Sequence, residues 1–327
     1  MAPPAALLFA LALLAGGALP RGASGLTMAG IVKRAANDDG SPSVCDLVHV
    51  NVDTGASASI AEIAECATFE SAWPSGSALD PAAGEIVFSV PGALSIWAVD
   101  VLTGAVRTVS ANLDYTDNQL IGASFVRGYL YILTRAVVYK VDPRGVEPAS
   151  TLVETDFPFE EGAPCTDSAS KIWLAQGNAS RVYEIDVDQA SVEPIFSGQS
   201  MPKDMAFNPI TGNLFQIANW KMFEYTTAGK ATQRGSIPGA GGPLYLHPRC
   251  LSIDAQGNDI TITDFNNFHA TAITDLPTFS VNTPFPFGGT RMIGKDLYFI
   301  PDSLLRRRNA TTAAKPRAAS ALRGGML

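Results

Sequence analysis

Acidic, amide and imidazole side chains that could hold a ligand stand in the stretches that separate the apolar runs of this 327-residue chain. The strongest candidates for a ligand-binding site are Glu161, Asp204, His247, Asp264 and Asn266. Carboxylate and amide oxygens are the ligands that a hard cation such as Ca²⁺ prefers. The acidic balance of the chain, a net charge of −8, favours a cation or a polyhydroxyl ligand over an anion.

Catalytic signatures do not accompany these residues. The chain has no Gly-x-Ser-x-Gly elbow, His-Glu-x-x-His pair, Cys-x-x-Cys pair or phosphate-binding Gly-x-x-x-x-Gly-Lys loop. His247 and His269 could pair as acid and base, because histidine titrates near neutrality, but two histidines in neighbouring stretches do not define such a pair. Four aromatic residues could stack a sugar, anchor a partner or simply pack inside the fold: Trp73, Tyr115, Trp220 and Tyr245. The sequence favours binding over catalysis.

A repeat positions the candidate residues. Apolar residues alternate with period two or form short β-branched runs, which is typical of buried strands. The third strand of each expected unit ends at a similar mark, and the marks are Asp53, Asp100, Asp142, Asp186, Thr226 and Asp275. Their separations of 47, 42, 44, 40 and 49 residues match a four-stranded antiparallel blade. The sequence therefore predicts an all-β chain.

One stretch, from Leu246 to Asp275, resembles an NHL-type β-propeller repeat of the six-bladed, gluconolactonase-like families. Its letters are LHPRCLSIDAQGNDITITDFNNFHATAITD. The resemblance implies one six-bladed β-propeller over residues 26–303. An outer strand pair at 46–65 and an inner pair at 290–301 are expected to share one blade that closes the ring, since closure removes exposed sheet edges. Residues 28–35 are left as an added edge strand or as half of a seventh blade.

The expected blades have two unlike rims. Turns from first to second and from third to fourth strands are short and alike. Loops between blades, and from second to third strands, are longer and dissimilar, and they meet on the other rim. Because variable loops usually carry the function of such scaffolds, the five candidate residues are expected to form one polar site there.

The resemblance also implies an alternative function. Gluconolactonase-like enzymes hold a metal with acid and amide ligands from separate blades, and Glu161-Gly162-Ala163-Pro164 is similar to their Glu-Gly-Pro element. A Ca²⁺-dependent lactonase or esterase is therefore the alternative to a binding or scaffold module.

Features of the N-terminus predict export. The apolar segment Ala5 to Leu19 is short for a membrane span and precedes small residues, so residues 1–25 are expected to be a cleaved signal peptide. Asn178 and Asn309 stand in glycosylation sequons. The expected location is extracellular, with no membrane span after cleavage and with an extracellular protein or a carbohydrate as the ligand.

Four cysteines suit an oxidising compartment. Cys45 and Cys66 flank a predicted hairpin whose turn would be centred between Gly55 and Ala56, and they should face each other within disulfide range. Cys165 and Cys250, in the first strands of two other blades, are expected to be buried thiols, with a disulfide as the alternative.

The C-terminal segment differs from the rest of the chain. Residues 304–327 hold six basic residues and no acid, so the remainder is more acidic than the net charge of −8 suggests. An acidic body argues against nucleic acid as a partner. The tail has no strand pattern and is expected to be disordered, either as a solvated end or as a docking or processing segment.

Overall fold

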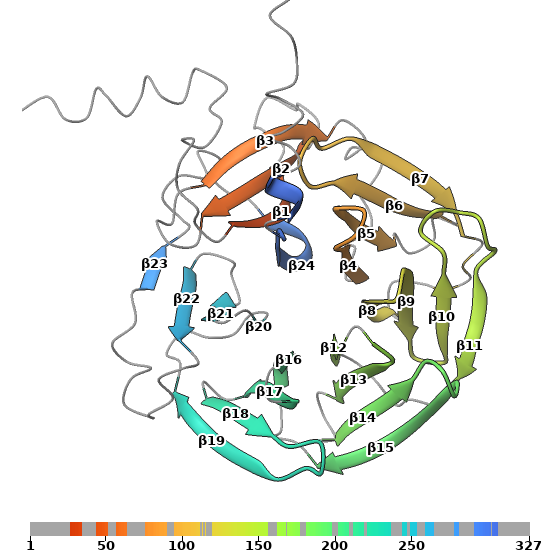
Figure 1. Ribbon diagram of the computed structural model, residues 1–327, viewed down its shortest axis with the longest axis vertical. Coiled ribbons are helices and arrows are strands. Elements are labelled where there is room, and N and C mark those ends of the chain that lie inside the picture. Colours follow the sequence, from red (N-terminus) through yellow and green to blue (C-terminus); the bar gives the residue numbers. More distant parts are fainter. Residues whose placement is uncertain are drawn as a thin grey trace, which may run out of the picture.

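β-strands account for most of the residues that the computed structural model describes. These residues are 27–34, 44–51, 57–63, 76–89, 95–111, 113, 115, 120–155, 162–167, 169–176, 181–197, 202–208, 212–218, 221–236, 244–246, 249–253, 259–264, 278–280, 291–301 and 303–306. The described strands form six antiparallel sheets of four strands each, arranged around a common centre (Figure 1). The expected all-β architecture of four-stranded units is confirmed.

Five of the sheets use four consecutive strands, with the first strand innermost (Figure 1). Sheet B contains β4 (Gly76–Asp80), β5 (Glu85–Ser89), β6 (Ser95–Asp100) and β7 (Val106–Ser110). Sheet C contains β8 (Leu120–Val126), β9 (Tyr129–Thr134), β10 (Val137–Val141) and β11 (Ser150–Glu154). Sheet D contains β12 (Gly162–Thr166), β13 (Lys171–Gln176), β14 (Arg181–Asp186) and β15 (Ser191–Ser197). Sheet E contains β16 (Pro202–Asn208), β17 (Asn213–Ala218), β18 (Lys221–Tyr225) and β19 (Ala231–Ser236).

Sheet A joins the two ends of the described chain. Its order is β24-β1-β2-β3, and its strands are β1 (Thr27–Arg34), β2 (Val44–Asn51), β3 (Ser57–Ile63) and β24 (Arg291–Phe299). The segments expected to share a blade therefore lie in one sheet, but the expected two-plus-two division is wrong. The C-terminal segment supplies one strand, β24, and β1 lies second in the sheet, so residues 28–35 are neither an edge strand nor part of a further sheet.

Sheet F also differs from its expected strand assignment. It contains β20 (Leu244–Leu246), β21 (Arg249–Ile253), β22 (Asp259–Asp264) and β23 (Thr278–Ser280), in that order. The run ending at Asp264 is therefore the third strand of its sheet. The repeat pattern predicted this run as the second strand, with the third strand ending at its mark, Asp275. Asp264 takes that mark instead, and Asp275 lies outside the described residues.

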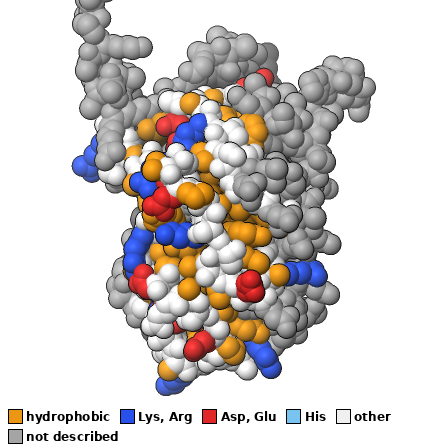
Figure 2. All heavy atoms as spheres, turned by 90° about the vertical axis from the view of Figure 1, so that its right-hand side faces the viewer, with side chains coloured by type: hydrophobic (Ala, Val, Ile, Leu, Met, Phe, Trp, Pro, Cys, Tyr) orange, Lys and Arg blue, Asp and Glu red, His pale blue; other side chains and the backbone are white. Residues whose placement is uncertain are grey.

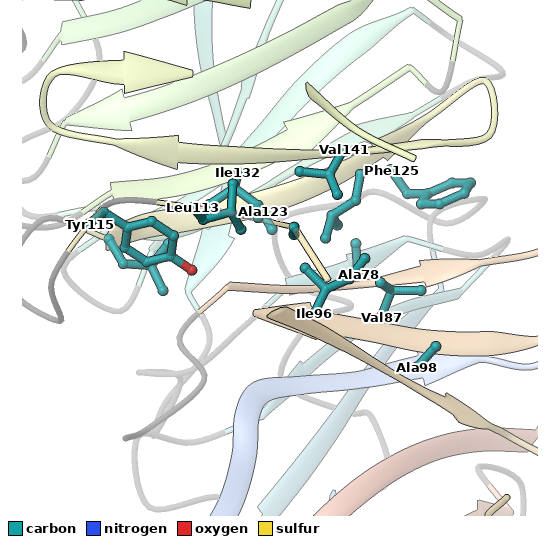
Figure 3. Packing of buried hydrophobic residues seen from close by; sticks show 13 residues of the cluster. Ala78, Val87, Ile96, Ala98, Leu113, Tyr115, Ala123, Phe125, Ile132 and Val141 are labelled. Atoms are coloured by element: carbon teal, nitrogen blue, oxygen red, sulfur yellow. The ribbon is translucent and has the colours of Figure 1, made fainter. Parts of the chain in front are cut away.

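Hydrophobic side chains fill the seams between neighbouring sheets. In β5, Ile86 and Phe88 belong to the cluster shared with sheet A, whereas Val87 belongs to the cluster shared with sheet C. Figure 3 shows the second cluster, where Ala78 and Ile96 of sheet B face residues of sheet C. Because sheet B is buried on both faces, an inner strand such as β5, with the letters EIVFS, reads as a nearly continuous apolar run.

The recurrent aspartate at the end of the third strand caps the turn that follows. Asp100 Oδ1 accepts hydrogen bonds from the backbone N–H groups of Leu102 and Thr103, at 2.9 and 2.8 Å. In sheet D, Asp186 Oδ1 accepts from the N–H groups of Asp188 and Gln189, at 2.9 and 3.0 Å. Aspartate is suited to this position because its short carboxylate reaches backbone groups two and three residues ahead. The repeat mark is thus a structural element.

Asp142→Ala is expected to lower the free energy of unfolding by about 2–3 kcal/mol, because hydrogen bonds to a charged acceptor are the stronger kind. Asp142 is only 2% exposed, and its carboxylate accepts from the N–H groups of Arg144, Val146 and Glu147. Urea unfolding followed by circular dichroism measures the loss. Asp142→Asn, which keeps one acceptor oxygen, should lose less, and equal losses for the two variants would contradict the capping role.

A glycine in the turns after β6 and β10 lets sheets B and C each pack closely on the sheet before it. Gly104, in the β6–β7 turn, has φ +73°, and a Cβ there would lie 2.4 Å from the Cβ of Ala61 in β3. Gly145, after β10, has φ +72°, and a Cβ there would lie 2.9 Å from Cγ1 of Val109 in β7. Both the left-handed backbone and the close approach require glycine.

Residues 303–306 form one helical turn directly after β24. Leu304 is 4% exposed and belongs to the cluster between sheets A and B, and its Cδ1 lies 3.0 Å from the position of a Cβ on Gly84. The backbone N–H of Ile300 donates to the carbonyl of Thr27, at 2.9 Å. The packed body therefore continues past residue 303, where the basic tail was expected to begin.

Candidate ligand-binding face

Strand order gives the ring two rims. First strands begin, and second strands end, on what we call the loop rim. First and third strands end on what we call the turn rim. Antiparallel neighbours run in opposite directions, so the place of a strand in its sheet sets the rim at which that strand begins and the rim at which it ends.

Polar side chains on the turn rim hold neighbouring sheets together. Arg127, in the β8–β9 turn of sheet C, donates from Nη1 and Nη2 to the two carboxylate oxygens of Asp188 in sheet D, at 2.9 and 2.7 Å, and from Nε to the carbonyl of Ala169. Arg107 of sheet B donates from Nε to Glu85 Oε1 of its own sheet at 2.8 Å, and from Nη1 to the carbonyl of Pro143 in sheet C. A guanidinium is suited to both tasks because its donors form a planar fork.

Electrostatics on this rim follow from the same contacts. The ammonium of Lys171 lies 2.7 Å from Asp186 Oδ2 and 2.6 Å from Glu184 Oε1. Its hydrogen bond, together with the backbone donors of the cap, holds the pKa of Asp186 below its ordinary value, and the two carboxylates raise the pKa of Lys171. Burial alone would raise the pKa of Asp142, but the Arg144 guanidinium and the backbone N–H groups lower it. These charges serve the fold.

The lowered pKa of Asp186 predicts a pH dependence of stability. A carboxylate whose pKa is lower in the folded state stabilises that state above its unfolded value, near 3.8, and the contribution is lost as the pH falls through the folded value. Lys171→Met is therefore expected to reduce the free energy of unfolding more at pH 7 than at pH 3. Urea unfolding at a series of pH values measures the difference, and an equal loss at both pH values would contradict it.

β-bulges interrupt two first strands at the loop rim. In sheet C the pairing shifts between Leu120 and Gly122, which leaves Ile121 as the extra residue. In sheet E it shifts between Pro202 and Asp204, which leaves Lys203 as the extra residue. Bulges occur often beside functional sites, where they redirect side chains and end regular pairing. Asp204 thus directly follows a bulge at the loop-rim end of an inner strand.

Inner strands contact one another between these bulges. A Cβ on Gly122 of β8 would lie 2.6 Å from Cγ of Pro164 in β12, and every residue of β8 is buried. At another seam, between sheets B and A, Ser77 Oγ of β4 and Tyr298 OH of β24 are 2.7 Å apart. Small residues such as Gly122 and Ser77 let the inner strands approach closely, so any ligand at the loop rim would rest on packed strands.

The five predicted site residues do not all share a rim. Asp204, at the start of first strand β16, is on the loop rim, as expected. Asp264 ends third strand β22 and is on the turn rim, so its expected placement is wrong, because the run was counted as a second strand. Glu161, His247 and Asn266 are outside the described residues.

Metal-binding geometry can be assessed only for the described part of the chain. Within it, no group of three or more His, Cys, Asp or Glu side chains could hold a metal ion. Glu161, the acid of the element similar to that of gluconolactonase-like enzymes, falls outside it.

The cysteines follow the expected pattern in part. Cys165 is a buried thiol in first strand β12, as predicted. Cys45 is buried in β2, but its neighbour across the ladder is Ile63 and not Cys66, because the pairing of Val50 with Ser57 sets a turn centred earlier than expected. The bulge at Ile60 moves the register only one residue toward Cys66. Cys66 lies outside the described residues, and Cys250 is in second strand β21 and not in a first strand.

Sequence reasoning missed the residues that tie the turn rim together. Arg127 and Asp188 are 61 positions apart, and no local pattern links them. The only signal available was Arg127-Gly128 between two apolar runs, which is typical of a two-residue hairpin turn; the positive φ values of 48° and 86° bear this out. Lys203 was also missed, because no sequence signal marks a bulge.

Comparison with known proteins shows the fold. No protein-family model matches the chain, and no curated protein matches it. Among solved structures, the chain is similar to one in the crystal structure of a nidogen/laminin complex, with a TM-score of 0.56 and 9% identity over 83% of this chain and 96% of that chain. The chain has a β-propeller fold. At this identity the likeness extends to the fold alone.

Two further structures are more distant. A catalytically inactive virginiamycin B lyase from Staphylococcus aureus with quinupristin has a TM-score of 0.49 and 13% identity over 86% of this chain and 97% of that chain. A luciferin-regenerating enzyme has a TM-score of 0.48 and 11% identity over 65% of this chain and 78% of that chain.

Proposed function

We propose that this propeller is an extracellular binding module whose ligand, a protein or a carbohydrate, lies on the loop rim. One observation carries the proposal. Charged groups of the turn rim are engaged within the protein, as Asp100, Asp142 and Asp186 cap turns and Arg127 bridges two sheets. Dissimilar loops converge on the other rim, and loops of that kind usually carry recognition in rigid scaffolds.

Glu161 and Asp204 are the proposed ligand-binding residues on this rim. Asp204 lies near the start of first strand β16, and Glu161 directly precedes first strand β12 in the sequence. Because first strands are innermost, we propose that both residues lie near the axis of the ring. Sheets D and E, to which their strands belong, are neighbours, because Trp173 of β13 stacks on Phe207 of β16 with ring centroids 5.0 Å apart. Two carboxylates near one axis suit a cation, for which Ca²⁺ is the first probe, or the hydroxyls of a sugar.

We also infer that the ring has six blades and is closed by β24. The six described sheets, the β24–β1 pairing and the Ser77–Tyr298 hydrogen bond between sheets B and A support this reading. Closure would leave no gap between the first and last sheets, as propellers require.

Export is part of the same proposal. Residues 1–25 would be a signal peptide, and Asn178 and Asn309 would carry glycans. A Cys45–Cys66 disulfide is also proposed, and Cys45 is buried in β2. Within the described residues, no helix has the length and hydrophobicity needed to cross a membrane.

The test compares the two rims. The protein, expressed through a secretory route, would be screened on a glycan array and titrated with Ca²⁺. Glu161→Gln and Asp204→Asn should weaken the binding that is found at least tenfold. Asp188→Asn, a matched carboxylate on the turn rim that is 55% exposed, should change it less than twofold.

Three outcomes would overturn the proposal. If only Asp188→Asn weakens binding, the wrong rim has been chosen. If neither glycans nor extracellular proteins bind but Ca²⁺ supports hydrolysis of a lactone, the module is an enzyme of the alternative class. If N-terminal sequencing and non-reducing peptide mapping find Met1 retained and Cys66 as a thiol, export is wrong.

A further inference from the structure

Outer strands are the open edges of a propeller, and in this protein they differ in whether a β-bulge interrupts the strand. Four of the six outer strands carry a one-residue bulge, at Ile60 in β3, Leu152 in β11, Ile195 in β15 and Arg234 in β19. Bulges twist an edge and prevent another strand from pairing with it. β15 also contains Pro194, which has no N–H to offer.

β7 is the exception among these edges. It pairs with β6 from Val106 to Ser110 through five successive residues with no shift of register. The remaining outer strand, β23, has only three residues. Thr108 and Ser110 are exposed, and in the described part of the chain no other strand pairs with β7. β7 therefore presents a regular row of backbone groups at the outside of the ring (Figure 1).

An exposed apolar residue adjoins this edge. The β10–β11 turn of sheet C contacts β7 at two points. Arg107 of β7 donates to the carbonyl of Pro143, and Gly145 packs against Val109 of β7. The next residue, Val146, is 81% exposed and is the only large hydrophobic side chain in the described residues that is so open to solvent. A segment paired with β7 would pass close to it.

In the two ion pairs beside β7, the basic side chain is more exposed to solvent than its acidic partner. The side chain of Arg107 is 36% exposed, whereas that of its partner Glu85 is 15% exposed. The side chain of Arg144 is 62% exposed, whereas that of its partner Asp142 is 1% exposed. The exposed acid of the same turn, Glu147, accepts a hydrogen bond from Tyr129 OH at 3.0 Å. Two guanidiniums thus face solvent while their carboxylates are covered. Figure 2 shows the side of the molecule that includes β7 and β11, where charges of both signs are interspersed with hydrophobic side chains.

We propose that β7 is a docking site for an extended, acidic segment of a partner protein, which adds a fifth strand to sheet B and rests an apolar side chain on Val146. In such recognition the backbone hydrogen bonds give affinity, and alternate side chains give specificity. Side chains two positions apart lie on the same face of an added strand. An acidic and an apolar residue at that spacing would meet the Arg107 and Arg144 guanidiniums and Val146 on the face of sheet B that packs against sheet C. This site is separate from the loop rim and does not depend on the function proposed for it.

A second copy of this chain fits the edge less well. Five paired residues span about 17 Å, and stable interfaces between folded proteins bury roughly 1,200–2,000 Å². Two copies joined only through β7 would meet along this short line, and each would bring its own exposed guanidiniums toward the other. A flexible acidic segment needs no large buried interface, and its carboxylates attract the guanidiniums.

The experiment uses a fluorescent peptide, Glu-Ser-Val-Ser-Glu-Ser, whose two acids and one valine share a face when it is extended, and the full-length mature protein. Binding is followed by fluorescence anisotropy, and the site is located by amide hydrogen exchange. We expect the peptide to slow exchange in residues 106–110. A peptide N-methylated at alternate residues, which cannot pair, should bind at least tenfold more weakly, as should one with Lys in place of Glu.

Protein variants test the same site without disturbing the ladder. Val146→Ser should weaken binding about threefold or more, whereas Gln189→Ser, at an exposed turn residue of sheet D, should leave it unchanged. The proposal is wrong if exchange in residues 106–110 is unaffected at saturating peptide. It is equally wrong if the N-methylated or lysine peptides bind as well, or if size-exclusion chromatography shows a dimer that the peptide does not dissociate.

Discussion

Removal of residues 291–327 is expected to destabilise the protein by more than about 5 kcal/mol and to abolish its cooperative unfolding. The deletion takes away β24, which pairs with β1, and the Ser77–Tyr298 hydrogen bond between inner strands. It also removes Ile300 and Leu304, which are 3% and 4% exposed, and a fully buried aliphatic side chain contributes about 1.5–3 kcal/mol. Urea unfolding followed by circular dichroism and by tryptophan fluorescence measures both effects.

A shorter deletion is the matched control. Removal of residues 307–327 leaves β24 and Leu304 in place, so the midpoint and the slope of the unfolding curve should not change. If the two truncated proteins unfold alike and as the full chain does, β24 does not hold the ring together and the closure argument fails.

Gly104→Ala is the point substitution with the largest expected loss, about 2–5 kcal/mol. Two costs add at this position. A left-handed backbone costs a non-glycine residue roughly 1–2 kcal/mol, and at φ +73° Gly104 has that conformation. An extra methyl in a packed seam costs about 1–3 kcal/mol, and a Cβ here would lie 2.4 Å from Cβ of Ala61. Thermal and urea unfolding would measure the loss.

Gly128→Ala separates the two costs. Gly128 has φ +86° but nothing within 4 Å of a Cβ, so the substitution should lose only the backbone contribution. The difference between the two variants then measures how tightly the sheet B turn packs on β3. Equal losses would mean that this seam relaxes at no cost, contrary to the packing described above.

Most of the architecture could be predicted because a local signal repeats. An apolar run that ends in an aspartate, followed by a turn with glycine, marks the third strand wherever the carboxylate caps that turn, as at Asp100 and Asp142. Capping and hairpin turns are local, so the sequence alone reveals them. Alternation of buried residues along strands such as β6 is equally local.

The errors arose where two local signals competed. In sheet F, ITITD ending at Asp264 and TAITD ending at Asp275 carry the same mark, and the three-residue β20 was too short to settle the count. In sheet A, the letters IGKD resemble a hairpin turn, but they belong to one strand whose pairing with β1 shifts between Ala29 and Ile31. Pairing with β1 is fixed by contacts far apart in sequence, which local patterns do not report.

The candidate site was affected more than the fold by these errors. Miscounting one strand moves a residue to the opposite rim, because antiparallel neighbours run in opposite directions. This is why Asp264 was assigned to the wrong face, whereas Asp204, in a correctly counted strand, was not. Inter-sheet contacts such as Arg127–Asp188 leave no local signal, and so the structural role of the turn rim could not be predicted.

The order of strands in sheet A has a consequence for biosynthesis. β1 emerges from the ribosome among the first structured segments, but its inner neighbour, β24, begins only at Arg291. At roughly 5–20 residues per second, the intervening residues take on the order of 10–50 s to be made. Throughout that time β1 has an unpaired edge, which is the kind of surface that misassembles with other nascent chains. The N-terminal sheet therefore completes last, and this protein should depend on chaperones that shield a strand edge until translation has ended.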